Sequence, residues 1–422
     1  MSISYRLTSD PFTRLEAGMS DIAASVSGNA DFAQKQRFLF QHGVLRFSPA
    51  NIGLEFCGLN VDPHGTVTDE TAFQPPAIRP KRRPRYPGRN PRRFEEKYKE
   101  HNPQRYADTV GKVLASGKTP AGTHRPIMAP EILEVLSPKP GEIAVDCTLG
   151  FAGHAEQILA RLQPGGRLLG LDADPVELPK AEARLRALGF GADVFTAHRS
   201  NFAGLPQILA AAEIAGADII LADLGVSSMQ LDDPRRGFSV KNEGPLDMRM
   251  NPMRGQPASA FLAHVRPDVL ETVLSENADE PHAAVLAPVL AGRSFATTTA
   301  LAGAVRAALP RLNKEDCNLS IRRVFQALRI AVNDEFSALE TFLRNLPACL
   351  NPGGRAAILT FHSGEDRRVK KAFEAAFREG VYAEISREVL RPGEDERRAN
   401  PRSTPAKLRW AIKEKMPMTK HE

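Results

Sequence analysis

Between residues 142 and 223, short apolar runs alternate with segments of helical periodicity. Strands are predicted at 142–147, 167–172, 193–197 and 218–223, and helices at 155–162, 175–188 and 205–212. Strands that alternate with helices of this length pair in parallel and place the helices on both faces of one sheet. The sequence therefore predicts an α/β fold built on a doubly wound parallel sheet.

Residues 146–154 (DCTLGFAGH) join the first predicted strand to the first predicted helix. An acid at a strand tip, a glycine-containing turn and a helix start are how open α/β sheets present a nucleotide-like cofactor. Gly150 and Gly153 allow the backbone to turn tightly and to approach a ligand. Asp172 lies 19 residues after Gly153, at the end of the next strand, where a carboxylate can bind ribose hydroxyls.

The carboxyl ends of the other predicted strands bring further side chains to the same edge of the sheet. They are Asn201 with Phe202, Asp223, and His362 with Ser363. Phe202 can cover an adenine face, and Asp223 is aimed at the centre of the cleft. Singly, each acid could cap a helix and Phe202 could belong to the core, but their succession at the strand ends favours a ligand site. The third glycine of G-x-G-x-x-G is absent and acids are present, which favours S-adenosylmethionine over NAD.

The alternation stops after residue 234. Residues 235–320 hold Ala- and Leu-rich helical patterns and no convincing strand, which predicts an all-helical insertion. One long amphipathic helix is predicted at about 320–346, and its apolar stripe consists of Phe325, Leu328, Val332, Phe336, Leu339 and Leu343. A strand within 351–363, a helix at 365–377 and a last strand at 406–415 complete the sheet domain.

Residues 76–100 form a segment rich in proline and arginine. Ten Lys and Arg residues lie between Arg79 and Lys99 against two Glu, although the whole chain has a net charge of only +6. Repeated proline and mutual repulsion predict an extended segment. Its charge beside Tyr86 favours an arm that binds RNA phosphates, with a solvated spacer as the alternative.

The predicted organisation follows from these changes of pattern. It consists of an N-terminal β-containing module of unassigned role (1–75), the basic linker and lead-in (76–123), the first part of the sheet domain (124–234), the helical insertion (235–320), the second part of the sheet domain (321–415) and a tail (416–422).

The apolar runs are too short to cross a membrane, and the first residues lack the apolar core of a signal peptide. We therefore expect a cytoplasmic protein without a transmembrane helix. Cys57, Cys147, Cys317 and Cys349 lie far apart and form no C-x-x-C pair. They predict reduced thiols, and we expect neither a disulfide framework nor a metal site.

Several segments resemble the successive motifs of the RsmH (MraW) family. They read HRPIMAPEILEVLSPKPGEIAVDCTLGFAGH, GLDADP, ADLGVSSMQLDDPRRGFSVKNEGPLDMRM, FQALRIAVNDE, LNPGGRAAILTFHSGEDRRVK and NPRSTPAKLR. The resemblance runs from about residue 124 to 413 and has no counterpart for residues 1–120. It implies a class I methyltransferase fold with an inserted helical domain. It also implies S-adenosylmethionine as cofactor and the exocyclic N4 of a cytidine in small-subunit ribosomal RNA as substrate. We expect this RNA to be recognised within an assembled or assembling small ribosomal subunit.

The resemblance also implies a set of cofactor contacts. With Gly150 of the turn, they are Ala152, Gly153, His154, Asp172, Phe202, Asp223 and Gln230. The chain departs from the family at Phe151 and Ala152, where the family loop is richer in glycine, and at Gly364, where the family tends to carry leucine.

The amine of cytosine is a poor nucleophile, because its lone pair is delocalised into the ring. An acceptor beside the amine would localise the lone pair and take up a proton. The candidates are Asp223, Ser227, Ser228 and His362. Candidates to bind the surrounding phosphates are Arg235, Arg236, Arg249, Arg322, Arg323, Arg329, Arg367 and Arg368, most of which we expect to be solvated surface charges.

Other functions remain open at the level of sequence. One alternative is a methyltransferase that acts on another RNA or on protein, and another is a non-catalytic, cofactor-binding ribosome-assembly factor. A hydrolase built on His362, Ser363 and Asp366 is disfavoured, because these residues are close in sequence and no G-x-S-x-G elbow precedes them.

Overall fold

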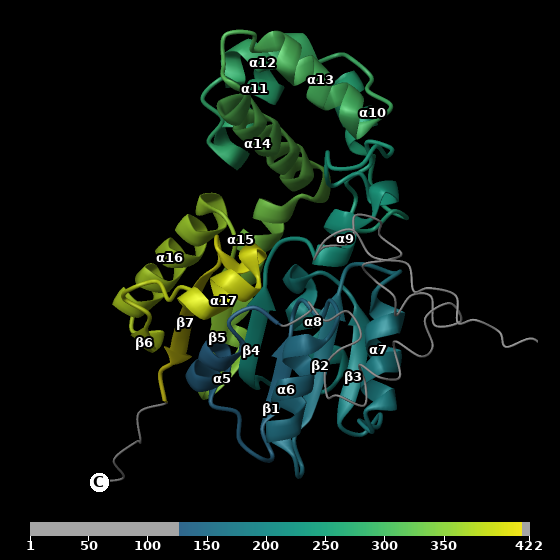
Figure 1. Cartoon of the computed structure of the whole chain (residues 1–422). Coiled ribbons are helices and arrows are strands. Elements are labelled where there is room, and N and C mark those ends of the chain that lie inside the picture. The colour runs from purple at the N-terminus through teal and green to yellow at the C-terminus, as the bar shows by residue number, and fades with distance from the viewer. Residues whose placement is uncertain (1–125, 416–422) are drawn as a thin grey trace, which may run out of the picture. The chain divides into compact units, whose positions relative to one another are not determined.

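The computed structural model describes residues 126–415. In this part of the chain, seven strands form one sheet in the order β3-β2-β1-β4-β5-β7-β6 (Figure 1). Their bounds are β1 Ile143–Asp146, β2 Arg167–Asp172, β3 Phe195–Arg199, β4 Ala217–Asp223, β5 Leu350–Thr360, β6 Tyr382–Ile385 and β7 Lys407–Lys413. Strands β1 to β5 pair in parallel, and β7 runs antiparallel to both β5 and β6. This order with its reversed edge is the class I methyltransferase arrangement, so the predicted fold class is confirmed.

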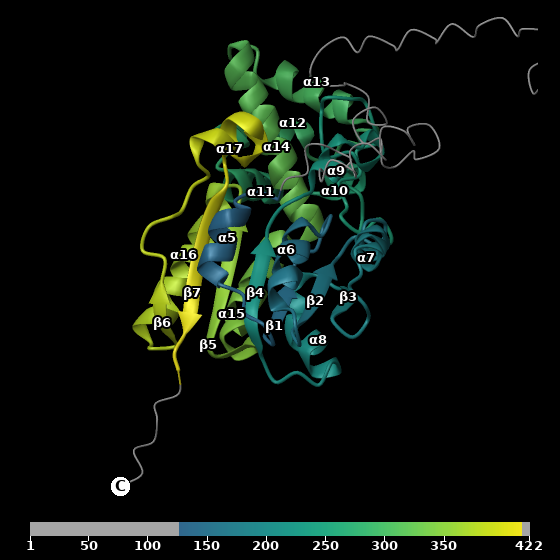
Figure 2. The ribbon, with the colours of Figure 1, turned by 60° about the horizontal axis from the view of Figure 1, so that its bottom comes forward.

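Helices cover both faces of the sheet (Figures 1 and 2). One face packs on α5, α6 and α7, and the other packs on α8, α15 and α16. These helices span Ala129–Leu136 (α5), Gly153–Leu162 (α6), Leu178–Ala187 (α7), Leu205–Ala211 (α8), Glu335–Cys349 (α15) and Ser363–Arg378 (α16). The sheet is therefore doubly wound, as the alternation of strands and helices predicts.

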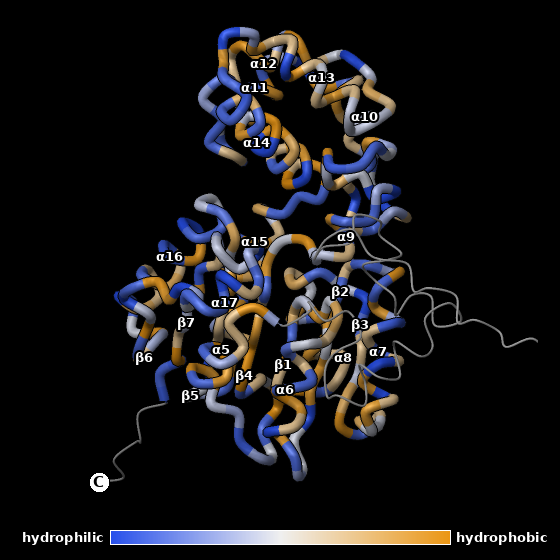
Figure 3. The backbone as a smooth tube through the Cα atoms, in the orientation of Figure 1, coloured by the Kyte–Doolittle hydropathy of each residue, from blue (hydrophilic) through white to orange (hydrophobic). Residues whose placement is uncertain are grey.

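The central strands are apolar along their whole length because both of their faces are buried. In β4, Ile219 and Leu221 belong to the core under α5 and α6, while Ile220 and Ala222 belong to the core under α8 and α15. Side chains alternate between the two faces of a strand, so each core receives every second residue. The backbone colours in Figure 3 show this hydrophobic centre of the sheet.

The segment between β4 and β5 carries a second, helical core. Helices α10 (Ala258–His264), α11 (Pro267–Ala278), α12 (Ala283–Leu290), α13 (Thr298–Ala308) and α14 (Lys314–Asn333) share buried side chains such as Leu262, Leu274, Leu290, Val305 and Leu328. They form a helical insertion, as the sequence predicts (Figure 1), but the predicted end at residue 320 falls inside α14, which packs in the insertion along its whole length.

The single helix predicted at about 320–346 is wrong. The chain forms α14 and α15 instead, and Asp334 between them has a left-handed backbone with φ 52°. The apolar stripe is divided accordingly: Phe325 and Leu328 pack in the insertion, whereas Leu339 and Leu343 pack on the sheet. The periodicity continues through Asp334, so the pattern of apolar residues did not reveal the break.

The sequence also missed strand β6, which forms the edge of the sheet beside β7. Only Tyr382 of its four residues is buried, so it lacks the apolar run of the central strands. The remaining short elements are α9 (Ser228–Asp232), α17 (Glu394–Ala399) and the 3-10 turns η2 (Phe202–Gly204), η3 (Pro234–Arg236) and η4 (Pro401–Ser403).

Several predictions fall outside the described residues. They are the module at 1–75, the basic segment at 76–100, Cys57 and the tail at 416–422. Within residues 126–415, Cys147, Cys317 and Cys349 are buried free thiols. The same part of the chain holds no helix long and apolar enough to cross a membrane, and no group of three or more potential metal ligands.

Candidate active site

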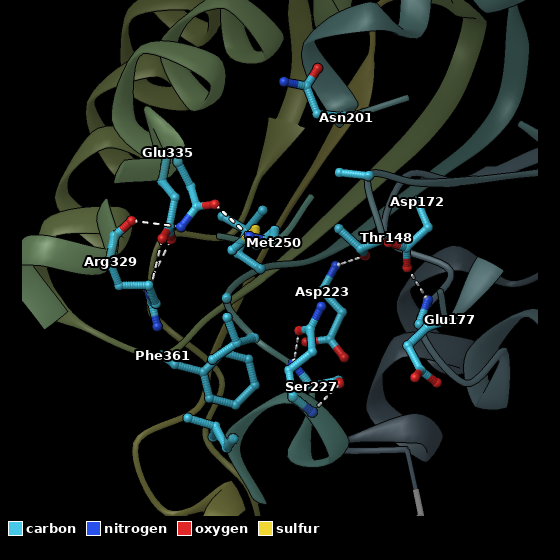
Figure 4. Close-up of a pocket in the computed structure, with 18 of the residues that line it drawn as sticks. Thr148, Asp172, Glu177, Asn201, Asp223, Ser227, Met250, Arg329, Glu335 and Phe361 are labelled. Atoms are coloured by element: carbon cyan, nitrogen blue, oxygen red, sulfur yellow. Dashed lines mark hydrogen bonds and ion pairs between the residues drawn. The ribbon is translucent and has the colours of Figure 1, made fainter. Parts of the chain in front are cut away.

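A large cavity opens at the carboxyl ends of the parallel strands. Its volume is about 1630 Å³, which is more than a single small ligand needs. One side is formed by the turn after β1, the end of β2 and Phe202, and the other by α14 and α15. Figure 4 places Asp172 and Glu177 on one side, Arg329 and Glu335 on the other, and Asp223 between them.

The structure brings most of the predicted site residues to this cavity. Those that line it are Gly150, Gly153, His154, Asp172, Phe202, Asp223, Ser227, Ser228 and Gln230. Ala152 and His362 are not among the described residues that line it. The side chain of Ala152 is fully buried in the core under α5 and α6.

The turn after β1 has an unusual backbone. Gly150 and Ala152 both have positive φ angles, 50° and 65°, although Ala152 carries a side chain that disfavours this conformation. Arg184 of α7 donates hydrogen bonds from Nη1 to the carbonyls of Phe151 (3.1 Å) and Ala152 (3.3 Å), and its guanidinium lies 4.6 Å from the centre of the Phe151 ring. Contacts from α7 therefore hold the turn where the chain departs from the glycine-rich family loop.

Asp172 at the end of β2 is fixed by two backbone groups. Its Oδ2 accepts a hydrogen bond from the N–H of Gly150, and its Oδ1 accepts one from the N–H of Asp174, both at 2.8 Å. Burial is the main reason why the pKa of Asp172 is raised to about 6, although both hydrogen bonds oppose the shift. Asp172 thus presents a desolvated acceptor beside the turn, where the sequence predicts ribose hydroxyls.

Asp223 at the end of β4 lies in the middle of the cavity (Figure 4). Its backbone N–H donates to Oγ1 of Thr148 at 2.6 Å, which ties the end of β4 to the end of β1. Its Oδ2 lies 3.6 Å from Nε2 of His154. Oδ1 of Asp223 and Nε2 of His154 are both buried, and neither has a hydrogen-bond partner within residues 126–415. Buried polar atoms are normally satisfied, so this pair is unusual. The Asp223 side chain is nevertheless 28% exposed, which leaves part of its carboxylate open to a ligand in the cavity.

Asp146 adds a further carboxylate beneath the site. It is 2% exposed at the end of β1. Burial raises its pKa to about 6, His154 opposes the shift, and the neighbouring carboxylates of Asp223 and Asp172 add to it. The ends of β1, β2 and β4 therefore concentrate negative charge around the turn.

Ser227 and Gln230 are largely occupied by the fold. Oγ of Ser227 accepts from the N–H of Gln230 at 3.2 Å, and Oε1 of Gln230 accepts from the N–H of Ser227 at 2.9 Å, which forms a capping box at the start of α9. Nε2 of Gln230 donates to Oδ2 of the fully buried Asp174 at 2.8 Å. Arg236 donates to the same oxygen at 2.8 Å. These bonds fix the segment after β4 against the loop after β2.

His362 caps a helix. Its Nδ1 accepts from the N–H of Glu365 at 3.4 Å at the start of α16, and its Nε2 lies 3.1 Å from Oε1 of Glu365. Phe361 and Glu365, its neighbours, line the cavity in its place. The disfavoured hydrolase is not assembled either, because Ser363 donates to Asp279 and Asp366 pairs with Arg409 and Lys407.

The wall formed by α14 and α15 contains Glu335 and Asn333, which the sequence did not indicate, and Arg329, which it indicated only as a candidate phosphate ligand. Arg329 and Glu335 form a two-pronged ion pair with both N–O distances at 2.8 Å. Burial raises the pKa of Glu335, and Arg329 opposes the shift. Asn333 joins this wall to the segment before α10: its Oδ1 accepts from the N–H of Met250 at 2.7 Å, and its Nδ2 donates to the carbonyl of Met248 at 2.8 Å.

Most of the arginines proposed as phosphate ligands are engaged in ion pairs. The pairs are Arg235 with Asp233, Arg236 with Asp174, Arg249 with Asp247, Arg329 with Glu335, Arg367 with Asp279 and Arg368 with Glu340. Arg322 is exposed and lines the cavity, and Arg323 does not line it. The sequence could not separate these groups because several of the partner carboxylates lie far away along the chain.

The neighbouring Phe336 explains why glycine stands at position 364, where the family tends to carry leucine. A Cβ atom at this position would lie 2.6 Å from the Phe336 ring, so a leucine would displace that ring. Phe336 is in turn covered by Arg368, whose guanidinium lies 3.6 Å from the ring centre. Phe336 therefore fills the space beside Gly364 in this chain.

Several known proteins similar to this chain in sequence are methyltransferases by name. A family model described as "MraW methylase family" matches residues 121–414. A protein of Alkaliphilus metalliredigens, "Ribosomal RNA small subunit methyltransferase H 2", is 49% identical over 341 residues, which cover 79% of this chain and 97% of that protein. A protein of Lachnoclostridium phytofermentans, "Ribosomal RNA small subunit methyltransferase H 1", is 47% identical over 343 residues, with coverage of 79% and 93%.

One solved structure illustrates a distant similarity. TrmN from Thermus thermophilus has a TM-score of 0.33 and 16% identity, covering 68% of this chain and 48% of that chain. This likeness is too low to carry an argument, and the fold assignment follows from the sheet order described above.

The sequence relatives also correct the expected extent of the resemblance. Residues 121–422 are less than three quarters of the chain, so a match over 79% of it takes in residues before 121. The prediction that residues 1–120 have no counterpart is therefore wrong for part of that segment. The family model and the near-complete coverage of these relatives agree: the chain belongs to the MraW methylase family.

Proposed function

We propose that this chain transfers a methyl group from S-adenosylmethionine to the exocyclic N4 of a cytidine in small-subunit ribosomal RNA. The observation that carries the proposal is that one cavity joins the turn after β1 to Asp223 and to the insertion. A cofactor and a nucleotide can thus occupy the same space with their reacting groups adjacent. Membership of a methylase family supports the reaction class, and the names of the relatives support the RNA substrate.

The residues around the turn suit S-adenosylmethionine. Asp172 has carboxylate lone pairs left to accept ribose hydroxyls after its two backbone bonds. The ring of Phe202 lines the cavity and is held edge-on by Phe342, with ring centres 5.5 Å apart. Gly150, Gly153 and His154 line the same cavity. When bound there, the cofactor supplies an electrophilic methyl group on a sulfonium sulfur.

Asp223 is the group best placed to receive the target amine. Its side chain is 28% exposed and lines the cavity, so the exposed part of the carboxylate can accept a hydrogen bond from the amine. Accepting that bond localises the nitrogen lone pair toward the methyl donor and prepares the departure of a proton. Ser227 and Ser228 line the same region, and the hydroxyl of Ser227 can still donate to the base. His362 does not line the cavity, but it caps α16, the helix that carries the cavity-lining Glu365.

The target base must leave its stack to reach Asp223, because the carboxylate lies inside the cavity. This requirement favours a nucleotide that is already unpaired or easily splayed. We propose that the enzyme acts on such a nucleotide within an assembled or assembling small ribosomal subunit.

Methyl transfer to isolated particles tests the proposal. Small ribosomal subunits from cells that lack this gene, and protein-free RNA extracted from them, are each incubated with the full chain and S-adenosylmethionine labelled in its methyl group. We expect label in the RNA of the subunits, and the comparison with free RNA identifies the preferred substrate. Label only in ribosomal protein, or none in either preparation while the cofactor still binds, would contradict the proposal.

A further inference from the structure

The rim of the cavity carries a set of basic side chains that have no ion-pair partner within residues 126–415. They are Arg199, Lys241, Arg254 and Arg322, and all of them are exposed while lining the cavity. Lys241, Arg254 and Arg322 come from the insertion, and we refer to these three residues as the basic rim. The other cavity-lining arginines are neutralised, since Arg329 pairs with Glu335 and Arg402 with Asp232.

The charge changes sign between the rim and the interior. The carboxylates of Asp172, Asp223 and Glu365 line the inner cavity, are at most partly exposed and form no ion pair with a Lys or Arg of residues 126–415. Glu335 also lines the cavity but is paired with Arg329, and Asp334 is the one exposed acid among the described lining residues. An acidic interior repels phosphate, whereas the basic rim attracts it. A nucleic-acid strand would therefore keep its backbone at the rim and send only an uncharged base inward.

The turn at residues 251–255 projects from this rim. The N–H of Met253 donates to Oδ1 of Asn251 at 2.9 Å, and the N–H of Arg254 donates to the carbonyl of Asn251 at 3.1 Å. Gly255 completes the turn with φ +70°. At its tip, Met253 is 81% exposed, the highest value among the large exposed hydrophobic residues of the described chain.

Two side chains anchor the backbone immediately before this turn. Asn333 at the end of α14 binds the backbone of Met250, and Arg236 donates from Nη2 to the carbonyls of Arg249 (3.2 Å) and Met250 (2.8 Å). The turn is thus held at a fixed place beside α14, which carries Arg322. An exposed apolar side chain on an anchored turn is suited to enter a space in its partner.

We infer that the basic rim binds the phosphates on either side of the target nucleotide and that Met253 fills the gap which the extruded base leaves in the RNA stack. This inference rests on the proposed function, because it assumes a base inside the cavity. Apolar side chains that enter base steps are a known way for proteins to hold a distorted strand. Cations at the rim and a wedge between them would together stabilise the splayed nucleotide.

The salt dependence of RNA binding tests the rim. Full chain carrying both Arg254→Gln and Arg322→Gln is compared with a control carrying Arg306→Gln and Arg311→Gln. The control removes the same charge from exposed positions of the insertion that do not line the cavity. The probe is a labelled RNA fragment that contains the methyl-accepting site. Loss of two contacts should reduce the slope of log Kd against log salt by about 1.4 in the rim variant and leave the control unchanged. Equal slopes in the two variants would contradict phosphate binding by the basic rim.

Met253→Ala tests the wedge, with Val269→Ala as the control because Val269 is exposed on α11 away from the cavity. The readout is the fluorescence of 2-aminopurine placed beside the target nucleotide, with kcat/KM for methyl transfer. We expect Met253→Ala to lower the fluorescence gain on binding and to reduce kcat/KM about tenfold, with cofactor affinity unchanged. Fluorescence and kcat/KM values equal to those of Val269→Ala would contradict the insertion of Met253 into the RNA stack.

The two proposals fail separately. If methyl transfer persists and the salt slopes of the two double variants agree, the role of the basic rim in phosphate binding is contradicted and the proposed function stands. A lower slope in the rim variant, in a protein that methylates no small-subunit RNA, would remove the proposed function and leave an RNA-binding rim.

Discussion

Asp223 combines features that single it out among the residues of the cavity. It lies at the end of β4, its backbone is tied to Thr148, and its Oδ1 is buried without a hydrogen-bond partner in the described chain. Because its side chain also lines the cavity and is partly exposed there, its carboxylate can accept a hydrogen bond from a donor group of a ligand. The proposed reaction supplies that donor as the amine of the target base.

Asp223→Asn should therefore abolish most methyl transfer. The amide keeps the shape of the side chain but is a far weaker acceptor of a proton. We expect kcat to fall at least about 100-fold, the usual scale for loss of an acid–base group. Single-turnover transfer of labelled methyl measures the effect, and Asp395→Asn, at an exposed position, serves as the control. An Asp223→Asn enzyme with the activity of the control would remove Asp223 from the reaction.

The pH dependence of stability reports on Asp146. An unfolded aspartate ionises near 3.8, whereas burial raises the pKa of Asp146 in the folded protein to about 6. Between these values the folded state holds the extra proton, so stability from this group falls as pH rises through the window and is constant above it. Asn cannot titrate. Asp146→Asn should therefore gain up to about 3 kcal/mol relative to the unmodified chain between roughly pH 4 and pH 7.

Urea unfolding at roughly pH 4 and pH 7 measures this difference. The signal is the fluorescence of Trp410, the single tryptophan of the chain. Asp395→Asn should show no such pH-dependent gain. If Asp146→Asn differs from the unmodified chain by the same free energy at both pH values, then Asp146 does not ionise within this window.

At this scale most of the site residues predicted from the sequence line the cavity, with Ala152 and His362 as exceptions, but the sequence did not predict how each is engaged. Asp172 and Asp223 could be placed because strand ends share an edge of the sheet. The hydrogen bond from Gln230 to Asp174 and the ion pair of Arg329 with Glu335 depend on side-chain packing between elements. No local spacing encodes it.

At the scale of elements, the junction between α14 and α15 separates the core of the insertion from the core of the sheet. Asp334 supplies the turn with φ 52°. Aspartate tolerates this left-handed conformation better than most residues, glycine adopts it freely, and β-branched residues resist it.

Asp334→Val should destabilise the chain by about 1–2 kcal/mol, because the junction requires a left-handed backbone. Asp334→Gly should be neutral or slightly stabilising for the same reason. Urea unfolding measures both variants against Ser337→Val, which introduces valine at an exposed position within α15. Equal losses for Asp334→Val and Ser337→Val would show that the backbone of the junction is not under this constraint.

Local patterns predicted the elements themselves where both faces of a strand are buried, as in β1, β2 and β4. They did not predict β6, whose pairing depends on β7 beside it rather than on its own apolar content. Nor did they predict the break at Asp334, because an amphipathic stripe can continue while the backbone turns.

At the scale of the whole molecule, the basic segment at 76–100 stays a prediction from sequence. If it binds RNA phosphates, replacing Arg82, Arg83, Arg92 and Arg93 by Gln in the full chain should lower the salt slope of RNA binding by up to about 3. Titrations of the RNA fragment at several salt concentrations measure the slope. An unchanged slope, with cofactor affinity intact, would assign the segment the role of a spacer.

The identity of the methylated nucleoside tests the central claim most directly. Small subunits from cells lacking this gene are incubated with the full chain and isotope-labelled S-adenosylmethionine, and the RNA is digested for nucleoside mass spectrometry. We predict that the label appears in 4-methylcytidine. Label in any other nucleoside, or in none, would contradict a cytosine-N4 methyltransferase of small-subunit ribosomal RNA.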